Sequence, residues 1–295
     1  MGAADVVPGV SGGTIAFITG IYETLINSIH ACDQKAVKML FKGQIKQLWE
    51  HVNGTFLVTL LAGILVSVAS LSRLLVYLLE HHTSLLWSFF FGLIVASAVV
   101  ILPKVKKWSI APILTLLIGI AIAWYISTAT QAQTPEGLWF VFLSGAIAIC
   151  AMILPGISGS FILLLLGKYD YILTAIKDLK IDVIITFALG CVVGLLSFAR
   201  LLKWLLKHYY DAFVALLTGF MIGALSKVWP WKYTVETYTD RHGETKPLVQ
   251  ENVLPQAFEE LTGQPAQWMA CIALAVAGFL VIFLTTKLLG KDTEQ

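Results

Sequence analysis

Long runs without acidic or basic side chains dominate the chain, and short polar segments separate them. Most of these runs approach the roughly 20 residues that an α-helix needs to cross the hydrocarbon core of a bilayer. Two of them continue past a single arginine, Arg73 or Arg200. The pattern therefore predicts transmembrane helices at 55–79, 84–102, 110–127, 183–206, 211–229 and 267–289.

Two other apolar regions do not fit a single span. Residues 137–167 are interrupted at Pro155-Gly156, so we expect a helix at 138–153, a loop, and a second helix at about 160–176. The apolar stretch 14–29 is too short for an untilted span. Non-helical backbone at membrane depth is tolerated only where protein or water satisfies it. We therefore predict that 8–30 and 138–176 are re-entrant or hairpin elements.

The composition agrees with a membrane protein. Of 295 residues, 58% are hydrophobic and only 13% are charged, whereas soluble domains are nearer one quarter charged. This excludes a soluble enzyme and a nucleic-acid-binding domain, and the net charge of +2 points to no polyanionic partner. The four cysteines show no metal-ligand spacing, and no nucleotide-binding motif is present. We expect no cofactor and no metal.

The charges between the helices predict the orientation. Basic residues outnumber acidic ones in 31–54 and in 103–109, and short basic loops stay in the cytoplasm. The 203–211 turn and the C-terminal tail are placed on the same side. The acidic segment 229–266 and the loop 128–137 are then expected to lie outside.

One sequence pattern occurs twice. Residues 7–13 (VPGVSGG) recur as 154–160 (LPGISGS), and Gly-Ile-Tyr-Glu at 20–23 recurs as Gly-Lys-Tyr-Asp at 167–170, always 147 positions later. A second set of matches, which pairs Arg73 with Arg200, is separated by 127 positions. The difference corresponds to the basic segment 31–54 in the first copy. The chain is therefore an internal duplication.

Each copy would contain one re-entrant element followed by three transmembrane helices, and an odd number of spans turns the second copy upside down. We therefore predict an all-α polytopic membrane protein built as one membrane domain from two inverted repeats, residues 1–130 and 138–289. Inverted repeats with broken helices near the midplane are typical of secondary transporters. The alternative is a duplicated bundle whose symmetry serves only packing.

The two breaks are the strongest candidates for chemistry. Proline and glycine interrupt the chain at Pro8, Gly9, Pro155 and Gly156. Apolar helices start directly afterwards, so free N–H groups and the positive end of the helix dipole favour an anion there. We predict that two tips bind a phosphate, with these candidate residues: Ser11, Gly12, Gly13, Thr14, Ser158, Gly159 and Ser160. The alternative is ordinary helix capping.

Four other charged residues occur in matched positions. Arg73 and Arg200 suit a pair of phosphate ligands, because guanidinium is a planar, bidentate donor; alternatively, they extend to the membrane interface. Glu23 and Asp170 are candidates for proton coupling if burial raises their pKa values, although both could lie at the interface instead. Asp5 has no acidic counterpart, so we expect it to cap or pair near the first tip, with a secondary place in coupling.

The segment DVVPGVSGGT at 5–14, followed by Gly-Ile-Tyr-Glu at 20–23, resembles the signature of the bacterial polyprenyl-phosphate transporter family. The resemblance covers nearly the whole chain. It implies a multi-pass protein of the bacterial cytoplasmic (inner) membrane that returns undecaprenyl phosphate across that membrane for reuse in cell-envelope synthesis. The implied partners are the polyprenyl-phosphate lipid and the bilayer, with no nucleic acid; the oligomeric state, including a homo-oligomer, is left open.

We therefore expect a flippase that moves a lipid phosphate from the outer to the inner leaflet. The headgroup would bind between the tips, and the lipid tail would pass through a lateral opening and remain in the bilayer. Two alternatives stay open. A small-anion channel or secondary anion transporter would use the same tips without a lateral gap. A membrane enzyme would need a nucleophile with a base or metal, and no motif supplies one.

Overall fold

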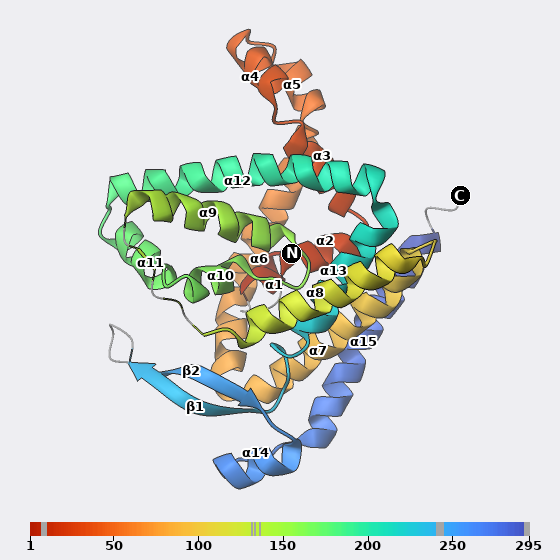
Figure 1. Ribbon diagram of the computed structural model, residues 1–295, viewed down its shortest axis with the longest axis vertical. Helices are drawn as coiled ribbons and strands as arrows, with labels where there is room; N and C mark the ends of the chain where they lie inside the picture. The colour runs from red at the N-terminus through yellow and green to blue at the C-terminus, as the bar shows by residue number, and fades with distance from the viewer. Residues whose placement is uncertain (7–10, 131, 133, 136, 240–244, 292–295) are drawn as a thin grey trace.

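The structure, a computed structural model, is almost entirely helical apart from one β-hairpin (Figure 1). It describes residues 1–6, 11–130, 132, 134–135, 137–239 and 245–291. The predicted break at Pro8 and Gly9 lies outside the described residues. The corresponding break at Pro155 and Gly156 is described, between α9 and α10.

Five of the described helices are long and apolar enough to cross a membrane. They are α6 (Gly54–His81), α7 (Thr83–Ile101), α8 (Ile110–Thr128), α12 (Ile181–His208) and α15 (Trp268–Lys291). Two shorter apolar helices are α9 (Leu138–Ile153) and α13 (Tyr210–Ala224). The prediction of an all-α polytopic membrane protein is confirmed. The predicted span 211–229 is shorter than expected because α13 ends at Ala224.

The helix predicted at 160–176 is wrong, because the chain forms two helices there that meet at 104°. These are α10 (Gly159–Leu165) and α11 (Tyr169–Lys177). The break falls at Gly167, which has φ +62°. The N–H of Gly167 binds the carbonyl of Leu164, and the N–H of Lys168 binds that of Leu163. This is the bond pattern by which glycine ends a helix.

The N-terminal region has the same construction. A short α1 (Gly2–Val6) is followed by α2 (Gly12–Ile18) and α3 (Tyr22–His30). Gly20, with φ +75°, ends α2 in the same way. The N–H of Gly20 binds the carbonyl of Phe17, and the N–H of Ile21 binds that of Ala16. Both regions predicted to be re-entrant therefore contain two short helices that meet at a glycine corner.

The duplicated sequence produces elements of equal length. Helices α2 and α10 have 7 residues each, α3 and α11 have 9, and α6 and α12 have 28. The repeat therefore extends to local structure. The inverted relation of the two halves stays a prediction.

Two polar segments contain elements that the sequence pattern did not predict. The basic segment 31–54 forms α4 (Gln34–Phe41) and α5 (Ile45–His51). The segment 229–266, expected as a loop, contains an antiparallel hairpin, β1 (Lys232–Thr239) and β2 (Thr245–Asn252), and helix α14 (Pro255–Thr262). A single turn of 3₁₀ helix, η1 (Leu102–Lys104), follows α7.

The long helices pack in pairs: α7 with α15, α8 with α13, and α9 with α12 (Figure 1). Glycines allow the backbones to approach closely, as small residues do in membrane helix pairs. A Cβ on Gly92 would lie 1.8 Å from the carbonyl oxygen of Ala275, and one on Gly219 would lie 2.3 Å from that of Leu116. The main buried cluster lies where α2, α7 and α13 meet, around Ile94, Leu217 and Met221.

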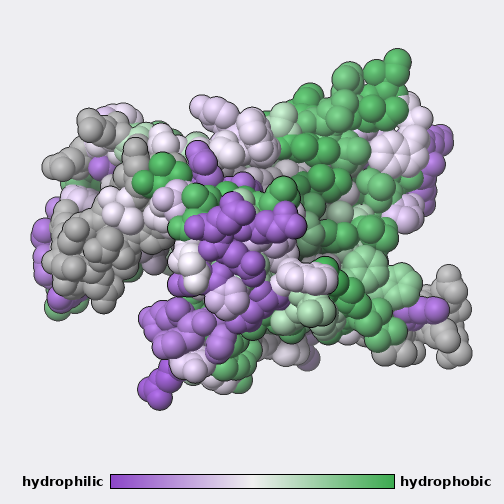
Figure 2. Space-filling view, turned by 90° about the horizontal axis from the view of Figure 1, so that it is seen from below, coloured by the Kyte–Doolittle hydropathy of each residue, from purple (hydrophilic) through white to green (hydrophobic). Residues whose placement is uncertain are grey.

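The two ends of the molecule differ. Helices α4 and α5 extend from one end, and the hairpin and α14 lie at the other (Figure 1). The carboxylate of Asp211 accepts hydrogen bonds from the N–H groups of Lys106 and Lys107, which joins the basic 103–109 loop to the start of α13. Seen from the hairpin end, hydrophilic residues gather beside a continuous hydrophobic surface (Figure 2).

The α7–α15 contact gives a direct test of the packing. In Gly92→Ala the added methyl group cannot fit against the Ala275 carbonyl, so we expect a loss of about 1–3 kcal/mol in the free energy of unfolding, the range for overpacked sites. Thermal unfolding of the purified protein in detergent measures it. Gly63→Ala is the matched control, because nothing lies within 4 Å of its Cβ position. Equal melting temperatures for the two variants would contradict the packing.

Candidate functional site

The two predicted tips lie against each other. The hydroxyl of Ser11, at the start of α2, donates to the carbonyl oxygens of Met152 and Leu154 at 3.0 and 3.1 Å. In the opposite direction, the backbone N–H of Gly156 donates to Thr14 Oγ1 at 3.0 Å. Ser11 and Thr14 are both buried. The structure thus joins segments that are about 140 residues apart in the sequence.

A glycine at position 13 is required for this contact. Its ideal Cβ would lie 2.2 Å from the carbonyl oxygen of Ile153, so a larger residue would push the two tips apart. Gly13 also donates its N–H to Ser11 Oγ at 3.0 Å, which makes Ser11 the N-cap of α2. The hydroxyl of Ser11 is therefore engaged within the protein in both of its roles, as donor and as acceptor.

The first tip already has an anion of its own. The carboxylate of Asp5 accepts a hydrogen bond from the N–H of Gly12 at 2.7 Å. A negative side chain at a helix N-terminus satisfies a free N–H group and interacts favourably with the helix dipole. Asp5 thus occupies the position at which the sequence predicted a phosphate oxygen.

The second tip has a different environment. The hydroxyls of Ser158 and Ser160 form a hydrogen bond to each other at 2.9 Å, and Ser158 is buried while Ser160 is exposed. The ammonium group of Lys227, in the segment after α13, lies 4.0 Å from the centre of the Phe161 ring on α10. Lys227 and Ser158 line the same small cavity, together with Gly156, Ser127 and Phe161. The second tip therefore combines hydroxyl groups with a cation.

That cavity has a volume of about 10 Å³. A space of this size is about that of one water molecule, and a phosphate group does not fit in it. In this conformation the second tip is closed to a headgroup.

The sequence pattern missed Lys227 and also a lysine beside the other tip helix. The ammonium group of Lys104 in η1 lies 5.6 Å from the centre of the Phe17 ring, near the end of α2 that is farther from the first tip. Each tip helix thus has an aromatic ring with a lysine over its face, an arrangement that favours the cation. The repeat gave no signal for either lysine, because the residues 127 positions away are Trp231 for Lys104 and Val100 for Lys227.

The structure does not gather the other predicted residues at the tips. Arg73 on α6 and Arg200 on α12 are exposed, and Arg200 is an electrostatic neighbour of His30 at the end of α3. Glu23 and Asp170 lie in the first turns of α3 and α11 and are also exposed. Among the residues that the structure describes, no group of three or more His, Cys, Asp or Glu side chains could hold a metal ion.

The contact between the tips can be tested at Thr14. In Thr14→Val the N–H of Gly156 loses its acceptor, and an unpaired buried group of this kind costs about 1–3 kcal/mol. We expect a lower unfolding midpoint for the purified protein in detergent. Thr14→Ser keeps the hydroxyl and should remain close to the native chain. If the serine variant loses as much stability as the valine variant, the hydrogen bond does not hold the tips together.

Comparison with known proteins agrees with the membrane architecture. Residues 1–246 match the family described as VCA0040-like, undecaprenyl phosphate translocase-like. A protein of Vibrio cholerae serotype O1 named polyprenyl-phosphate transporter is 46% identical over 291 residues, which cover 99% of this chain and 94% of that protein. A Staphylococcus aureus protein of the same name is 32% identical over 250 residues, or 78% of this chain and 83% of that one.

No solved structure matches the chain. The family match covers most of the sequence, and the Vibrio cholerae relative matches nearly all of it. The chain therefore belongs to the undecaprenyl phosphate translocase-like family of polyprenyl-phosphate transporters.

Proposed function

We propose that this protein moves a polyprenyl phosphate, undecaprenyl phosphate in particular, from the outer to the inner leaflet of the bacterial cytoplasmic membrane, where the lipid is reused for envelope synthesis. The observation that carries the proposal is the contact between the two tips, made by Ser11 and Thr14 with the segment before α10. Family membership and the names of the two relatives support the lipid. The basic loops and the C-terminal tail face the cytoplasm in this proposal.

The headgroup binds at the second tip. Lys227 supplies the positive charge, and Ser158 and Ser160 supply hydroxyl donors next to the start of α10. A charge-assisted hydrogen bond to phosphate is about twice as strong as a neutral one. Asp5 acts as a fixed anion that satisfies the first tip, so the headgroup's negative charge is directed to the second.

Transport requires the closed cavity to open. The two repeats rock against each other around the tip contact, which opens the site to one leaflet at a time. The lipid tail stays in the bilayer through a lateral opening. Arg73 and Arg200, exposed on the two long helices α6 and α12, receive and release the headgroup on the outer and the inner side.

The test is translocation of a fluorescent polyprenyl phosphate in proteoliposomes. We expect Lys227→Gln, Arg73→Gln, Arg200→Gln and the double variant Ser158→Ala/Ser160→Ala each to reduce the rate at least about tenfold, which corresponds to about 1.4 kcal/mol in the barrier. Lys207→Gln, at the exposed end of α12, is the control and should transport normally.

Normal transport by all four variants would overturn the assignment of the site. The same liposomes, loaded with a chloride- or phosphate-sensitive dye, separate the flippase from a small-anion channel. A channel would pass the free anion at a rate that added lipid does not change.

We also propose that proton movement through Glu23 and Asp170 drives the cycle. Both carboxylates occupy the first turn after the glycine corner of a re-entrant element, and Tyr210 at the start of α13 is an electrostatic neighbour of Glu23. A carboxylate that changes its exposure as the repeats move can bind a proton on one side and release it on the other.

This coupling predicts a change in pH dependence. The double variant Glu23→Gln/Asp170→Asn should transport polyprenyl phosphate at a rate that no longer varies with the pH gradient across the liposome membrane. Asp178→Asn, an acid just after α11, serves as the control and should keep the dependence. An unchanged dependence in the double variant would remove proton coupling through these two acids.

A further inference from the structure

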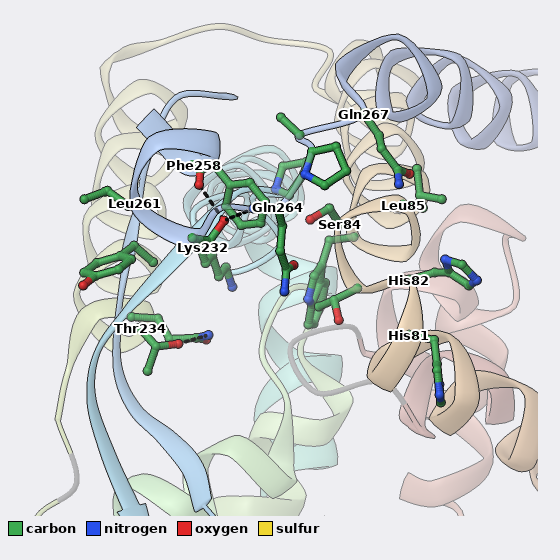
Figure 3. Close-up of a pocket in the computed structure, with 18 of the residues that line it drawn as sticks. His81, His82, Ser84, Leu85, Lys232, Thr234, Phe258, Leu261, Gln264 and Gln267 are labelled. Carbon is green, nitrogen blue, oxygen red and sulfur yellow. Dashed lines mark hydrogen bonds between the residues drawn. The ribbon is translucent and has the colours of Figure 1, made fainter. Parts of the chain in front are cut away.

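A polar pocket distinct from the tip cavity opens at the hairpin end (Figure 3). Its volume is about 530 Å³. Five elements line it: the end of α6 with His81, the start of α7, strand β1 with Lys232, strand β2 with Gln250, and α14 with the following loop, which contributes Gln264. The pocket is large enough for a phosphate with its hydration water.

Lys232 is the one lysine that lines this pocket among the residues described. Its ammonium group donates to the carbonyl oxygen of Lys227 and lies 5.0 Å from the centre of the Trp87 ring. No described carboxylate forms an ion pair with it. Burial, followed by the nearby charge of Lys227, lowers the pKa of Lys232 to about 7. A poorly solvated ammonium group without a counter-ion favours the arrival of an anion.

An apolar groove of about 630 Å³ adjoins the pocket. His82 and Leu85 line both spaces, so the polar pocket and the groove lie side by side. The groove runs between α6, α7 and α15, and its lining includes Ala4 of α1 and Ile15 of α2. Apart from His82, every residue that lines it is apolar. It therefore leads from the hairpin end to the elements of the first tip.

We propose that this pocket and groove form a loading site for a prenyl phosphate, with the phosphate beside Lys232 and the first isoprene units in the groove. The proposal rests on the function proposed above and adds a second place for the lipid, separate from the tips. Charge complementarity selects the headgroup, and the adjoining apolar groove selects a lipid over free phosphate. On the predicted orientation, the hairpin end faces outward, where the lipid would be collected.

Binding to the full-length protein in nanodiscs tests this, with farnesyl phosphate, farnesol and inorganic phosphate as probes. We expect Lys232→Gln to lower the affinity for farnesyl phosphate at least about tenfold and to leave the affinity for farnesol unchanged, because only the charge contact is lost. Leu274→Trp, which fills the groove, should lower the affinities for farnesyl phosphate and for farnesol by similar factors.

Two matched variants serve as controls. Leu280→Trp places the same ring on an exposed face of α15, and Lys207→Gln removes a lysine at the far end of α12; both should bind as the native chain does. Native affinity for farnesyl phosphate in Lys232→Gln or Leu274→Trp would overturn the proposal. Inorganic phosphate that binds as tightly as farnesyl phosphate would also overturn it, since the groove would then contribute nothing.

The pH dependence of binding gives an independent readout. A bound phosphate raises the pKa of Lys232 above its value of about 7 in the empty pocket. Its contribution to affinity is therefore complete below pH 7 and is lost as the pH rises through the higher, bound value. A phosphate monoester is already mostly a dianion above pH 7. The loss of affinity above that pH therefore comes from deprotonation of the protein and not of the ligand.

Lys232→Arg should keep its affinity in the alkaline range, because guanidinium stays charged. A parallel decline in this variant would assign the pH dependence to other groups around the pocket. The titratable or charged ones are Glu80, His81, His82, Tyr233 and Lys227.

The experiments distinguish a wrong loading site from a wrong transport function. Ser158→Ala/Ser160→Ala should slow translocation at least about tenfold and still bind farnesyl phosphate at the loading site. Lys232→Gln should raise the lipid concentration needed for half-maximal transport. If the native protein binds farnesyl phosphate through Lys232 but translocates no polyprenyl phosphate, the transport function is wrong and the binding site stands. If translocation is normal at every lipid concentration in Lys232→Gln, the loading site is wrong.

Discussion

The structure depends on how two bends in the chain satisfy their backbone polar groups. In hydrocarbon an unpaired N–H or carbonyl costs several kcal/mol, and each bend exposes such groups where a helix stops. Here side chains of the first tip satisfy the backbone of the second bend: Ser11 binds the carbonyls of Met152 and Leu154, and Thr14 accepts the N–H of Gly156. The second bend therefore depends on side chains of the first tip, which joins the two copies of the repeated pattern.

The two tips are alike in backbone and different in charge. Both begin a helix of 7 residues, and both helices end at a glycine corner. Asp5 supplies a carboxylate to the first tip, whereas Lys227 brings an ammonium group to the second. If the two tips carried the same charges, they would be equivalent binding sites for an anion. Because only the second tip has a cation, it is the favoured site, and this is the physical basis for placing the lipid headgroup there.

Lysines beside aromatic rings recur at the places where we infer that the headgroup binds or passes. Lys227 lies over Phe161 at the second tip, and Lys232 lies over Trp87 in the hairpin pocket. The carbonyl of Lys227 accepts the hydrogen bond from Lys232, so the two lysines are linked through the backbone between α13 and β1. An aromatic face stabilises a lysine ammonium group more weakly than a paired carboxylate does. The positive charge of the lysine therefore stays available to a phosphate. A mobile anionic substrate needs cations of this kind.

The sequence by itself determined the membrane class, most helix boundaries and the correspondence of the two tips, because apolar runs of fixed length and a repeated Pro-Gly-x-Ser-Gly pattern are local features. It could not give the corner at Gly167, the hairpin after α13 or the positions of Lys104 and Lys227. The corner and the hairpin are made by local backbone bonds that the apolar and polar runs do not reveal. The positions of the two lysines depend on contacts between segments far apart in the chain, and the repeat carries no matching lysines. Only the tertiary structure decided that Asp5 caps the first tip and that Arg73 and Arg200 are exposed, because residue spacing does not record the hydrogen bonds and packing between segments.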